Sequence, residues 1–235
     1  MSLIKDIEIN SKELLEILNK YVKLADSESF KETAELHKET QKDAEPGQRE
    51  RWTGEQYLND LRSGRLGDHE GFPDHFVAIN FKPNQPEFMY QCFKKDADHE
   101  KRMEVQETIY RLNEEMMTFL GVRNNALSAF YPPEGYISWH NNWNAPGYNL
   151  IFSWSETGDG WFKHLDPNTG KIVHHQDKPG WQLKAGYFGS HDEREKICWH
   201  TASTDCRRIT VSFIFDHSDM ALNLQDDVIA EISDP

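Results

Sequence analysis

The chain has 235 residues, enough for one domain, 1–235, with a sizeable core, and its 26 Lys and Arg against 40 Asp and Glu give a formal net charge of -14. This charge repels a phosphate backbone and so disfavours nucleic acid as a partner. No run approaches the roughly 18 apolar residues of a membrane span, and the charged N-terminus is not typical of a signal peptide. Three cysteines without a CxxC pair (Cys92, Cys198 and Cys206) then favour a cytoplasmic protein without disulfides.

Over residues 1–126 the sequence predicts mainly helices, with a few strands, that form an N-terminal support for the rest of the domain. Asn10 and Glu13 resemble a capping box, and apolar residues then recur at helical spacing, which predicts a first helix. The stretch 28–71 is rich in charged residues and glycine and predicts short helices and exposed loops. A strand is expected over 75–81, and apolar positions on one face of 105–120 predict a long helix that ends at Gly121.

Residues 127–216 change to short aromatic and β-branched runs separated by turn residues. The predicted strands are 127–131, 135–140, 148–155, 160–165, 171–175, 180–188, 196–200 and 207–215. Eight short strands with this punctuation predict a β-sandwich or barrel, with the N-terminal helices packed outside it. The fold class is therefore mainly β with flanking helices, and 217–235 is treated as a C-terminal tail.

Two histidines close two of the predicted strands, and each follows a tryptophan. His140 ends the strand 135–140, and His200 ends the strand 196–200. Alternation in the first strand places His140 on the same face as Tyr136 and Ser138, opposite Ile137 and Trp139. His140 therefore belongs to the more polar face, where it can reach a ligand.

The last predicted strand carries an anion site in outline. Alternation separates Arg208, Thr210 and Ser212 from an apolar face. A guanidinium that points into a barrel needs an opposite charge, and its fork of donors suits a carboxylate. A small dicarboxylate would satisfy it. Arg207 competes for this role, but strand alternation and the hydroxyl neighbours favour Arg208.

The order and spacing of these residues resemble the 2-oxoglutarate/iron(II) oxygenase superfamily over about 127–215. Members have a strand that ends in His-x-Asp/Glu, a distal His several strands later, and an Arg or Lys on the final strand followed by a hydroxyl residue. The counterparts here are His140, His200, Arg208 and Thr210. The resemblance implies a double-stranded β-helix (jelly-roll or cupin-like) core, similar to prolyl-hydroxylase-like, AlkB-like and aspartyl/asparaginyl hydroxylase-like members.

The same resemblance implies the cofactors and their binding residues. Iron(II) would be held by His140 and His200, and 2-oxoglutarate by Arg208 and Thr210. The segment from Tyr131 to His140 is similar to that of AlkB-type members, whose tyrosine hydroxyl helps to bind the cosubstrate, so Tyr131 inherits this role. The implied catalytic residues are His140, His200 and Arg208.

One position departs from the family pattern. Where the family has a carboxylate, this chain has Asn142, and an amide carbonyl is a weaker, neutral donor to iron(II). Three alternatives stay open for the third metal position. Asn142 ligates through its carbonyl, water fills the position as in the two-histidine aspartyl/asparaginyl hydroxylase relatives, or Asp159 reaches in from the following hairpin.

The implied activity is hydroxylation of a substrate C–H bond with 2-oxoglutarate and O2, releasing succinate and CO2. The prime substrate stays open among small molecules, peptides and proteins. Two other functions are kept: a cupin-like metal enzyme that does not use 2-oxoglutarate, and a non-catalytic binding module on a degenerate oxygenase scaffold.

Several other residues in the β half receive no central role. Trp143 follows the predicted metal loop and is a candidate floor for a substrate pocket. Four histidines lie in predicted hairpins, where imidazoles are usually solvated, and we assign them no role beyond substrate contact; they are His164, His174, His175 and His191.

Overall fold

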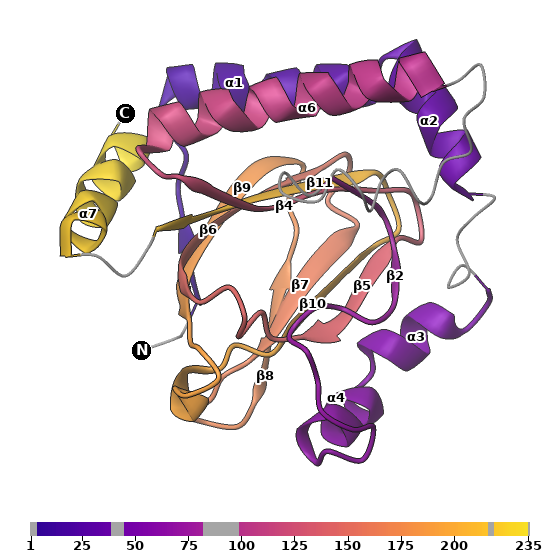
Figure 1. Cartoon of the computed structure of the whole chain (residues 1–235), viewed down its shortest axis with the longest axis vertical. Helices are drawn as coiled ribbons and strands as arrows, with labels where there is room; N and C mark the ends of the chain where they lie inside the picture. Colours follow the sequence, from indigo (N-terminus) through magenta and orange to yellow (C-terminus); the bar gives the residue numbers. More distant parts are fainter. Residues whose placement is uncertain (1–3, 39–44, 82–98, 216–218, 235) are drawn as a thin grey trace.

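The structure is a computed structural model that describes residues 4–38, 45–81, 99–215 and 219–234, and it contains two antiparallel sheets packed face to face (Figure 1). The six-stranded sheet has the order β1-β9-β6-β11-β4-β3, and the five-stranded sheet has the order β2-β5-β10-β7-β8. The strands are β1 (Ile4–Ile7), β2 (Phe76–Val77), β3 (Ile79–Phe81), β4 (Asn124–Tyr131), β5 (Tyr136–His140), β6 (Gly147–Ser155), β7 (Gly160–Leu165), β8 (Ile172–Gln176), β9 (Gly180–Phe188), β10 (His200–Thr204) and β11 (Arg208–Phe215).

The order of the strands confirms the predicted fold class. From β4 to β11 the chain passes back and forth between the sheets, so that β9-β6-β11-β4 faces β8-β7-β10-β5. Eight strands in two sheets with this connection pattern form a jelly roll, the double-stranded β-helix. The fold is therefore mainly β, with helices outside the sheets.

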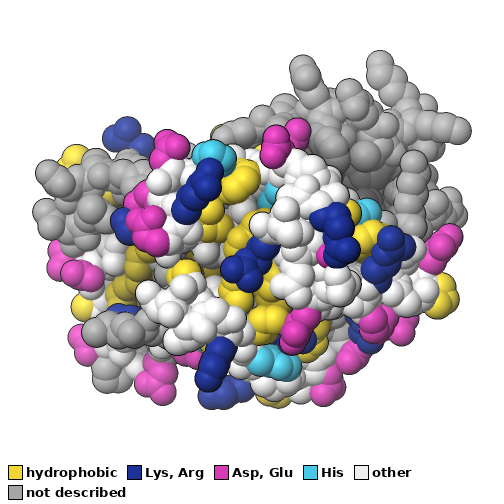
Figure 2. Space-filling model, turned by 90° about the horizontal axis from the view of Figure 1, so that it is seen from below, with side chains coloured by type: hydrophobic (Ala, Val, Ile, Leu, Met, Phe, Trp, Pro, Cys, Tyr) yellow, Lys and Arg dark blue, Asp and Glu magenta, His cyan; other side chains and the backbone are white. Residues whose placement is uncertain are grey.

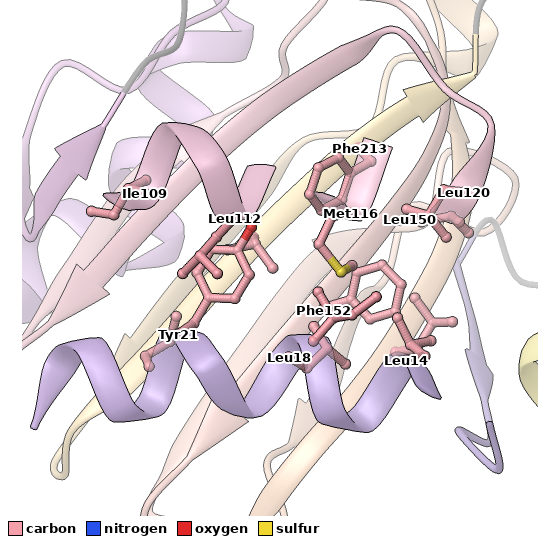
Figure 3. Close-up of a cluster of buried hydrophobic side chains, with 14 of the residues drawn as sticks. Leu14, Leu18, Tyr21, Ile109, Leu112, Met116, Leu120, Leu150, Phe152 and Phe213 are labelled. Carbon is pink, nitrogen blue, oxygen red and sulfur yellow. The ribbon is translucent and has the colours of Figure 1, made fainter. Parts of the chain in front are cut away.

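The largest hydrophobic core lies on the outer face of the six-stranded sheet. Helices α1 (Lys12–Ala25) and α6 (His99–Leu120) run side by side over this face, and α2 (Glu28–Lys38) contacts α6 (Figure 1). Their apolar faces meet the outward side chains of β6 and β11, as Figure 3 shows for Leu18, Met116, Phe152 and Phe213. Because burial of these apolar side chains is the main source of stability, this layer anchors the sheet.

A second apolar layer covers the five-stranded sheet. Helices α3 (Gln48–Thr53) and α4 (Glu55–Arg62) pack there, with Tyr57 and Leu58 against Trp139 and Trp199. The Trp139 indole Nε1 donates a hydrogen bond to the Thr53 carbonyl at 2.9 Å, which satisfies its buried N–H. Each sheet thus carries an apolar layer on its outer face.

Several N-terminal features differ from the prediction. Ser11, and not Asn10, caps α1 by accepting a hydrogen bond from the Leu14 N–H, while Asn10 donates its backbone N–H to Ile232. The expected strand 75–81 is divided at Ala78 into β2 and β3, which join different sheets. The four residues of β1 add an unpredicted edge strand beside β9.

Two further differences lie near the C-terminus. The predicted strand 196–200 does not form: residues 194–196 make a 3-10 turn, and His200 begins β10 and does not close a strand. The small polar run after His200 gave no strand signal, yet the Thr201 and Ser203 hydroxyls bind buried carbonyls of Ile137 and Gly135. The 217–235 tail contains helix α7 (Asp219–Ser233).

Other expectations can be compared directly. Helix α6 ends at Leu120 as predicted, and Gly121 takes φ +65°, a conformation that favours glycine after a helix. Cys198 and Cys206 are free thiols, whereas Cys92 lies outside the described residues. None of the helices in the described ranges has the length and apolar character that crossing a membrane requires. On the face shown in Figure 2, hydrophobic side chains gather between Lys and Arg side chains.

The layer beneath α1 and α6 predicts a strong dependence of stability on Phe152. Phe152→Ala removes a fully buried ring and should lower the free energy of unfolding by about 3–5 kcal/mol. Tyr110→Ala, at a residue of α6 that is 52% exposed, should change the free energy of unfolding by less than about 0.5 kcal/mol. Urea unfolding followed by circular dichroism measures both, and equal losses would contradict this assignment of the core.

Candidate functional site

A cavity of about 270 Å³ lies between the two sheets, and most of the predicted site residues line it. Its polar lining residues include His140, His200, Asn142 and Arg208. The rest of the lining is mainly apolar and is called the apolar wall; it includes Phe72, Pro73, Phe76, Leu127, Ile137, Ala145, Ile151, Phe162, Phe188, Ala202 and Ile214. A concave apolar pocket with a few converging polar groups is the usual form of a small-molecule site.

The two predicted histidines lie side by side on neighbouring strands. His140 on β5 and His200 on β10 are register partners, and their ring centroids are 4.1 Å apart. Each ring donates Nδ1–H to the carbonyl two residues earlier, Ser138 at 2.8 Å and Cys198 at 2.7 Å. In a neutral imidazole this leaves the lone pair on Nε2, the arrangement that metal-binding histidines use. Burial lowers the pKa of His200 to about 4, so its ring is neutral near pH 7.

A β-bulge places Ile137 on the same side of β5 as His140, which faces the cavity. The register between β10 and β5 shifts between His200 and Ala202, so that Ala202 faces Ile137. As a result Ile137 and His140 both line the cavity, although regular alternation predicted opposite faces for them. A bulge inserts an extra residue and changes which side chains share a face, and it is enriched next to active sites. The predicted grouping of His140 with Tyr136 and Ser138 was wrong for this reason.

The Asn142 side chain also reaches the histidine pair. Its backbone has φ +51°, a left-handed conformation that Asn tolerates better than most residues, and its N–H donates to the Gly71 carbonyl at 2.8 Å. The Asn142 Nδ2 lies 3.4 Å from His200 Nε2. Rotation of the amide by half a turn would present Oδ1 at the same place. The Asn142 amide is thus positioned beside Nε2 of His200.

The segment before β2 fixes the position of this loop. Gly71 has φ +95°, and a Cβ there would lie 2.7 Å from the Trp143 ring, so the close approach requires glycine. The Asn144 side chain donates to the Glu70 carbonyl at 2.8 Å. These contacts join the wall that carries Phe72 to the loop that carries Asn142.

Asp159, the third open alternative, is not near the histidine pair. It is exposed in the turn between β6 and β7, where its side chain accepts a hydrogen bond from Thr157. Its backbone carbonyl accepts a hydrogen bond from the N–H of Asp205, which follows β10 at the end opposite to His200. Within the described ranges, no group of three His, Cys, Asp or Glu side chains is placed to hold a metal ion. Of the three alternatives for the predicted third metal position, Asn142 and water therefore stay open.

Arg208 points into the cavity and Arg207 points away from it. The Arg208 side chain is 2% exposed and donates Nε–H to Asp177 at 2.7 Å, with further hydrogen bonds to Ser153 and Thr210. Arg207 is 38% exposed and pairs with Asp26 and Glu156. The alternation of β11 produces this difference, because neighbouring residues in a strand face opposite sides.

Tyr131 lies next to this guanidinium. The Arg208 Cζ is 5.4 Å from the centroid of the Tyr131 ring, and the two residues are register partners on β11 and β4. Burial raises the pKa of Tyr131 to about 12, so its phenol stays protonated and can donate a hydrogen bond. The structure therefore brings Tyr131, Arg208 and Thr210 together at one end of the cavity.

Sequence analysis missed three buried polar residues around the site. His164 on β7 is fully buried and is the register partner of His200, although we expected a solvated hairpin histidine. Its Nδ1 lies 3.2 Å from Nε2 of His175. Asp177 and Lys184 are also buried. Strand alternation over 180–188 places Lys184 on the side of the strand opposite to Leu183 and Ala185, which was a usable indication of its position. Asp177 follows a strand end, where no pattern indicates burial.

Trp143 does not floor the cavity as expected. It is not among the described residues that line the cavity, and it packs against His69 and His191 at ring-centroid distances of 6.2 Å and 4.7 Å. Trp143 thus packs behind the loop that carries Asn142 and supports it.

His174 contacts the Trp161 ring on the opposite face of β8 from His175.

The donor set fits both groups that the sequence resemblance implies. Two imidazoles that line one cavity, each with Nδ1–H held by a backbone carbonyl and Nε2 left for a ligand, suit a divalent transition-metal ion, including iron(II). The buried guanidinium, with hydroxyls beside it, suits a carboxylate. Both sets border one space, so one small ligand can meet both.

Comparisons with known proteins give limited information. No protein-family model matches the sequence, and no curated protein matches it at a significant level. Among solved structures, the chain is similar to a Pseudomonas putida prolyl-4-hydroxylase, with 12% identity, a TM-score of 0.31 and coverage of 68% of this chain and 83% of that one.

Two plant structures also show a distant likeness to the chain. A rice dioxygenase for auxin oxidation has 13% identity and a TM-score of 0.31, covering 73% of this chain and 64% of that one. The Arabidopsis thaliana dioxygenase for auxin oxidation 1, in a complex with 2-oxoglutarate, has 13% identity and a TM-score of 0.27, covering 61% and 63%. The chain thus spans less than two thirds of either plant protein. At such TM-scores these likenesses carry no argument, and the fold rests on the strand order itself.

The hydrogen bonds of the two histidines predict their tautomers. In metal-free protein at neutral pH, His140 and His200 should both carry the proton on Nδ1, because that nitrogen donates to a backbone carbonyl. Long-range ¹H–¹⁵N correlation spectra of ¹⁵N-histidine protein report the tautomer. His191, whose side chain is 62% exposed, serves as a control that should average between tautomers. An Nε2–H tautomer at either position would contradict the metal-binding geometry.

Proposed function

We propose that this protein is an iron(II)- and 2-oxoglutarate-dependent oxygenase that hydroxylates a C–H bond of a substrate still to be identified, forming succinate and CO2 with O2 as the oxidant. One observation carries the proposal. A single cavity is bordered by two histidines with Nε2 as the lone-pair nitrogen and by a buried arginine with hydroxyl neighbours. Residues 1–235 are proposed to act as one oxygenase domain, because the N-terminal helices share a core with the six-stranded sheet.

Each side chain has a defined task in this proposal. His140 and His200 hold the metal ion, and Asn142 or water takes a further position. Arg208, Thr210 and Tyr131 bind the far carboxylate of 2-oxoglutarate, so that its 2-oxo acid end faces the histidines. Bound together, iron(II) and 2-oxoglutarate supply the oxidising power when O2 reacts. The apolar wall excludes bulk water, which strengthens the polar contacts inside.

The apolar wall also limits the part of the substrate that enters. Among the described residues that line the cavity, Arg208 is the one side chain with a formal charge, and it is already paired with Asp177. A charged substrate group would therefore be buried without a partner, which is costly. The cavity volume lies just below the usual range of about 300–1,000 Å³ for ligand pockets, so the entering group is small. We expect the oxidised C–H bond to belong to a small uncharged group.

Two observations favour the other functions kept from the sequence. Asn142 brings a neutral amide to His200 Nε2 where the oxygenase pattern has a carboxylate, which favours a non-catalytic binding module without metal. The pairing of Arg208 with Asp177 favours a cupin-like metal enzyme that does not use 2-oxoglutarate, because the arginine already has a carboxylate partner. The two experiments below separate these functions from the oxygenase.

Anaerobic binding of iron(II) and 2-oxoglutarate tests the proposal directly. The protein should develop the weak visible charge-transfer band of the chelate, and His200→Ala should abolish it because a metal ligand is lost. His191→Ala, at an exposed position, is the control and should retain the band. A metal-only site would bind iron(II) without the band, and a non-catalytic module would bind neither.

The two adjacent arginines give a matched test of the cosubstrate site. Arg208→Met is made together with Asp177→Asn, so that no buried carboxylate is left without its counter-charge. This double variant should bind 2-oxoglutarate at least about 30-fold more weakly than the wild type. It should bind 2-oxopentanoate, which lacks the far carboxylate, almost unchanged. Arg207→Met should leave both affinities unchanged, and calorimetry with Mn(II)-loaded protein measures them without turnover.

A further inference from the structure

The ion pair between Arg208 and Asp177 is the most deeply buried one in the described part of the chain. The side chains are 2% and 0% exposed, and Nε donates to Oδ2 at 2.7 Å. Asp177 Oδ1 is buried and has no hydrogen-bond partner. A carboxylate in this position costs desolvation energy, so its presence calls for an explanation beyond stability.

The pair makes the polar end of the cavity electrically neutral. The protein groups that would face the proposed metal are two imidazoles, which bind a metal ion in their neutral form, and one amide. Lys184, which is buried nearby but does not line the cavity, lies 3.6 Å from Asp6, whose side chain is 69% exposed. Among the described residues that line the cavity, Arg208 is the one with a formal charge, and Asp177 cancels it.

A neutral cavity selects the charge of what binds in it. A divalent metal ion brings two positive charges, and these are cancelled by a ligand with two negative charges. A monoanion would leave one positive charge buried, which is unfavourable at low dielectric. Without Asp177, a dianion and the metal would also leave one positive charge. Succinate, the product, is a dianion as well, and CO2 is neutral, so the balance holds before and after turnover.

We propose that Asp177 is a positioning and specificity-determining residue that sets the charge of the cavity, so that it accepts a divalent metal ion together with a dianion. This inference rests on the proposed function. By accepting Nε–H, Asp177 also leaves the terminal nitrogens of Arg208, next to Thr210 and Ser153, as the edge that meets the ligand. Asp177 acts on the ligand through Arg208 and through its charge.

Asp177→Asn separates charge from position. The Asn amide oxygen can still accept the Arg208 Nε–H, so the guanidinium keeps its place while one negative charge is lost. Anions should then bind more tightly and cations more weakly. In Mn(II)-loaded protein, the Kd of the monoanion 2-oxopentanoate should fall about tenfold, the Kd of the dianion 2-oxoglutarate should fall by more than that, and the Kd of Mn(II) alone should rise about tenfold. If the substitution only damaged the structure, the binding of 2-oxoglutarate, 2-oxopentanoate and Mn(II) would weaken together.

Asn142→Asp supplies the reverse change with the ion pair intact. It adds a negative charge beside the metal, so Mn(II) should bind more tightly and both oxo acids about tenfold more weakly. In Asn142→Asp/Asp177→Asn, the affinity for 2-oxoglutarate should return to within about threefold of the wild type, because the total charge is restored. Should Asp177→Asn not fold, Asn142→Asp alone still tests the dependence on charge.

Glu156→Gln is the matched control, because Glu156 pairs with the outward Arg207 at the surface, where the charge is screened. It should change none of the affinities. The inference is overturned if Asp177→Asn folds and leaves anion affinity equal to or weaker than that of the wild type. The proposed function fails in a different way, when the wild type itself binds no 2-oxoglutarate in the presence of Mn(II).

Discussion

The site depends on the alternation of side chains along β11. Ile209, Val211, Phe213 and Phe215 face the helices α1 and α6 and belong to the largest core. Because each strand residue faces the side opposite to its neighbour, Arg208, Thr210 and Ser212 are forced into the space between the sheets. The apolar layers outside the two sheets supply most of the stabilising burial. The interior of the sandwich therefore need not supply most of the stability, and it can hold charged and hydroxyl groups, which a small β-sandwich core seldom tolerates.

The sequence predicted those features that regular strand geometry decides. The inward position of Arg208 and the outward position of Arg207 follow from alternation in an uninterrupted strand. His140 shows the limit of this reasoning, because a bulge between β5 and β10 changed the face of Ile137 while leaving the histidine inward. The signal for a bulge lies in the pairing of two strands and not in either one alone.

Other features depended on contacts that the sequence does not display. Residues 201–204 are small and mainly polar, so they gave no hydrophobic period, yet their backbone pairs with both β5 and β7, and the Thr201 and Ser203 hydroxyls bind buried carbonyls. Asp177 follows β8 at a strand end, where a carboxylate is ordinarily solvated. Its burial is a consequence of the partner that β11 places opposite it. A residue of this kind is recognised only when the tertiary structure supplies its counter-charge.

Asn142 affects both the backbone conformation of the loop after β5 and the charge of the cavity. Its left-handed conformation, held by the Gly71 carbonyl, suits both Asn and Asp, so conformation alone does not select the amide. What differs between the two residues is charge. With an amide beside the histidines, the proposed metal keeps its full positive charge and attracts the chelating end of an anion more strongly. The negative charge lies instead on Asp177, where it moderates the pull of Arg208 on the other end. In the proposed complex, the ligand is therefore held at both ends, by the metal at its chelating end and by Arg208, with its charge moderated by Asp177, at the other.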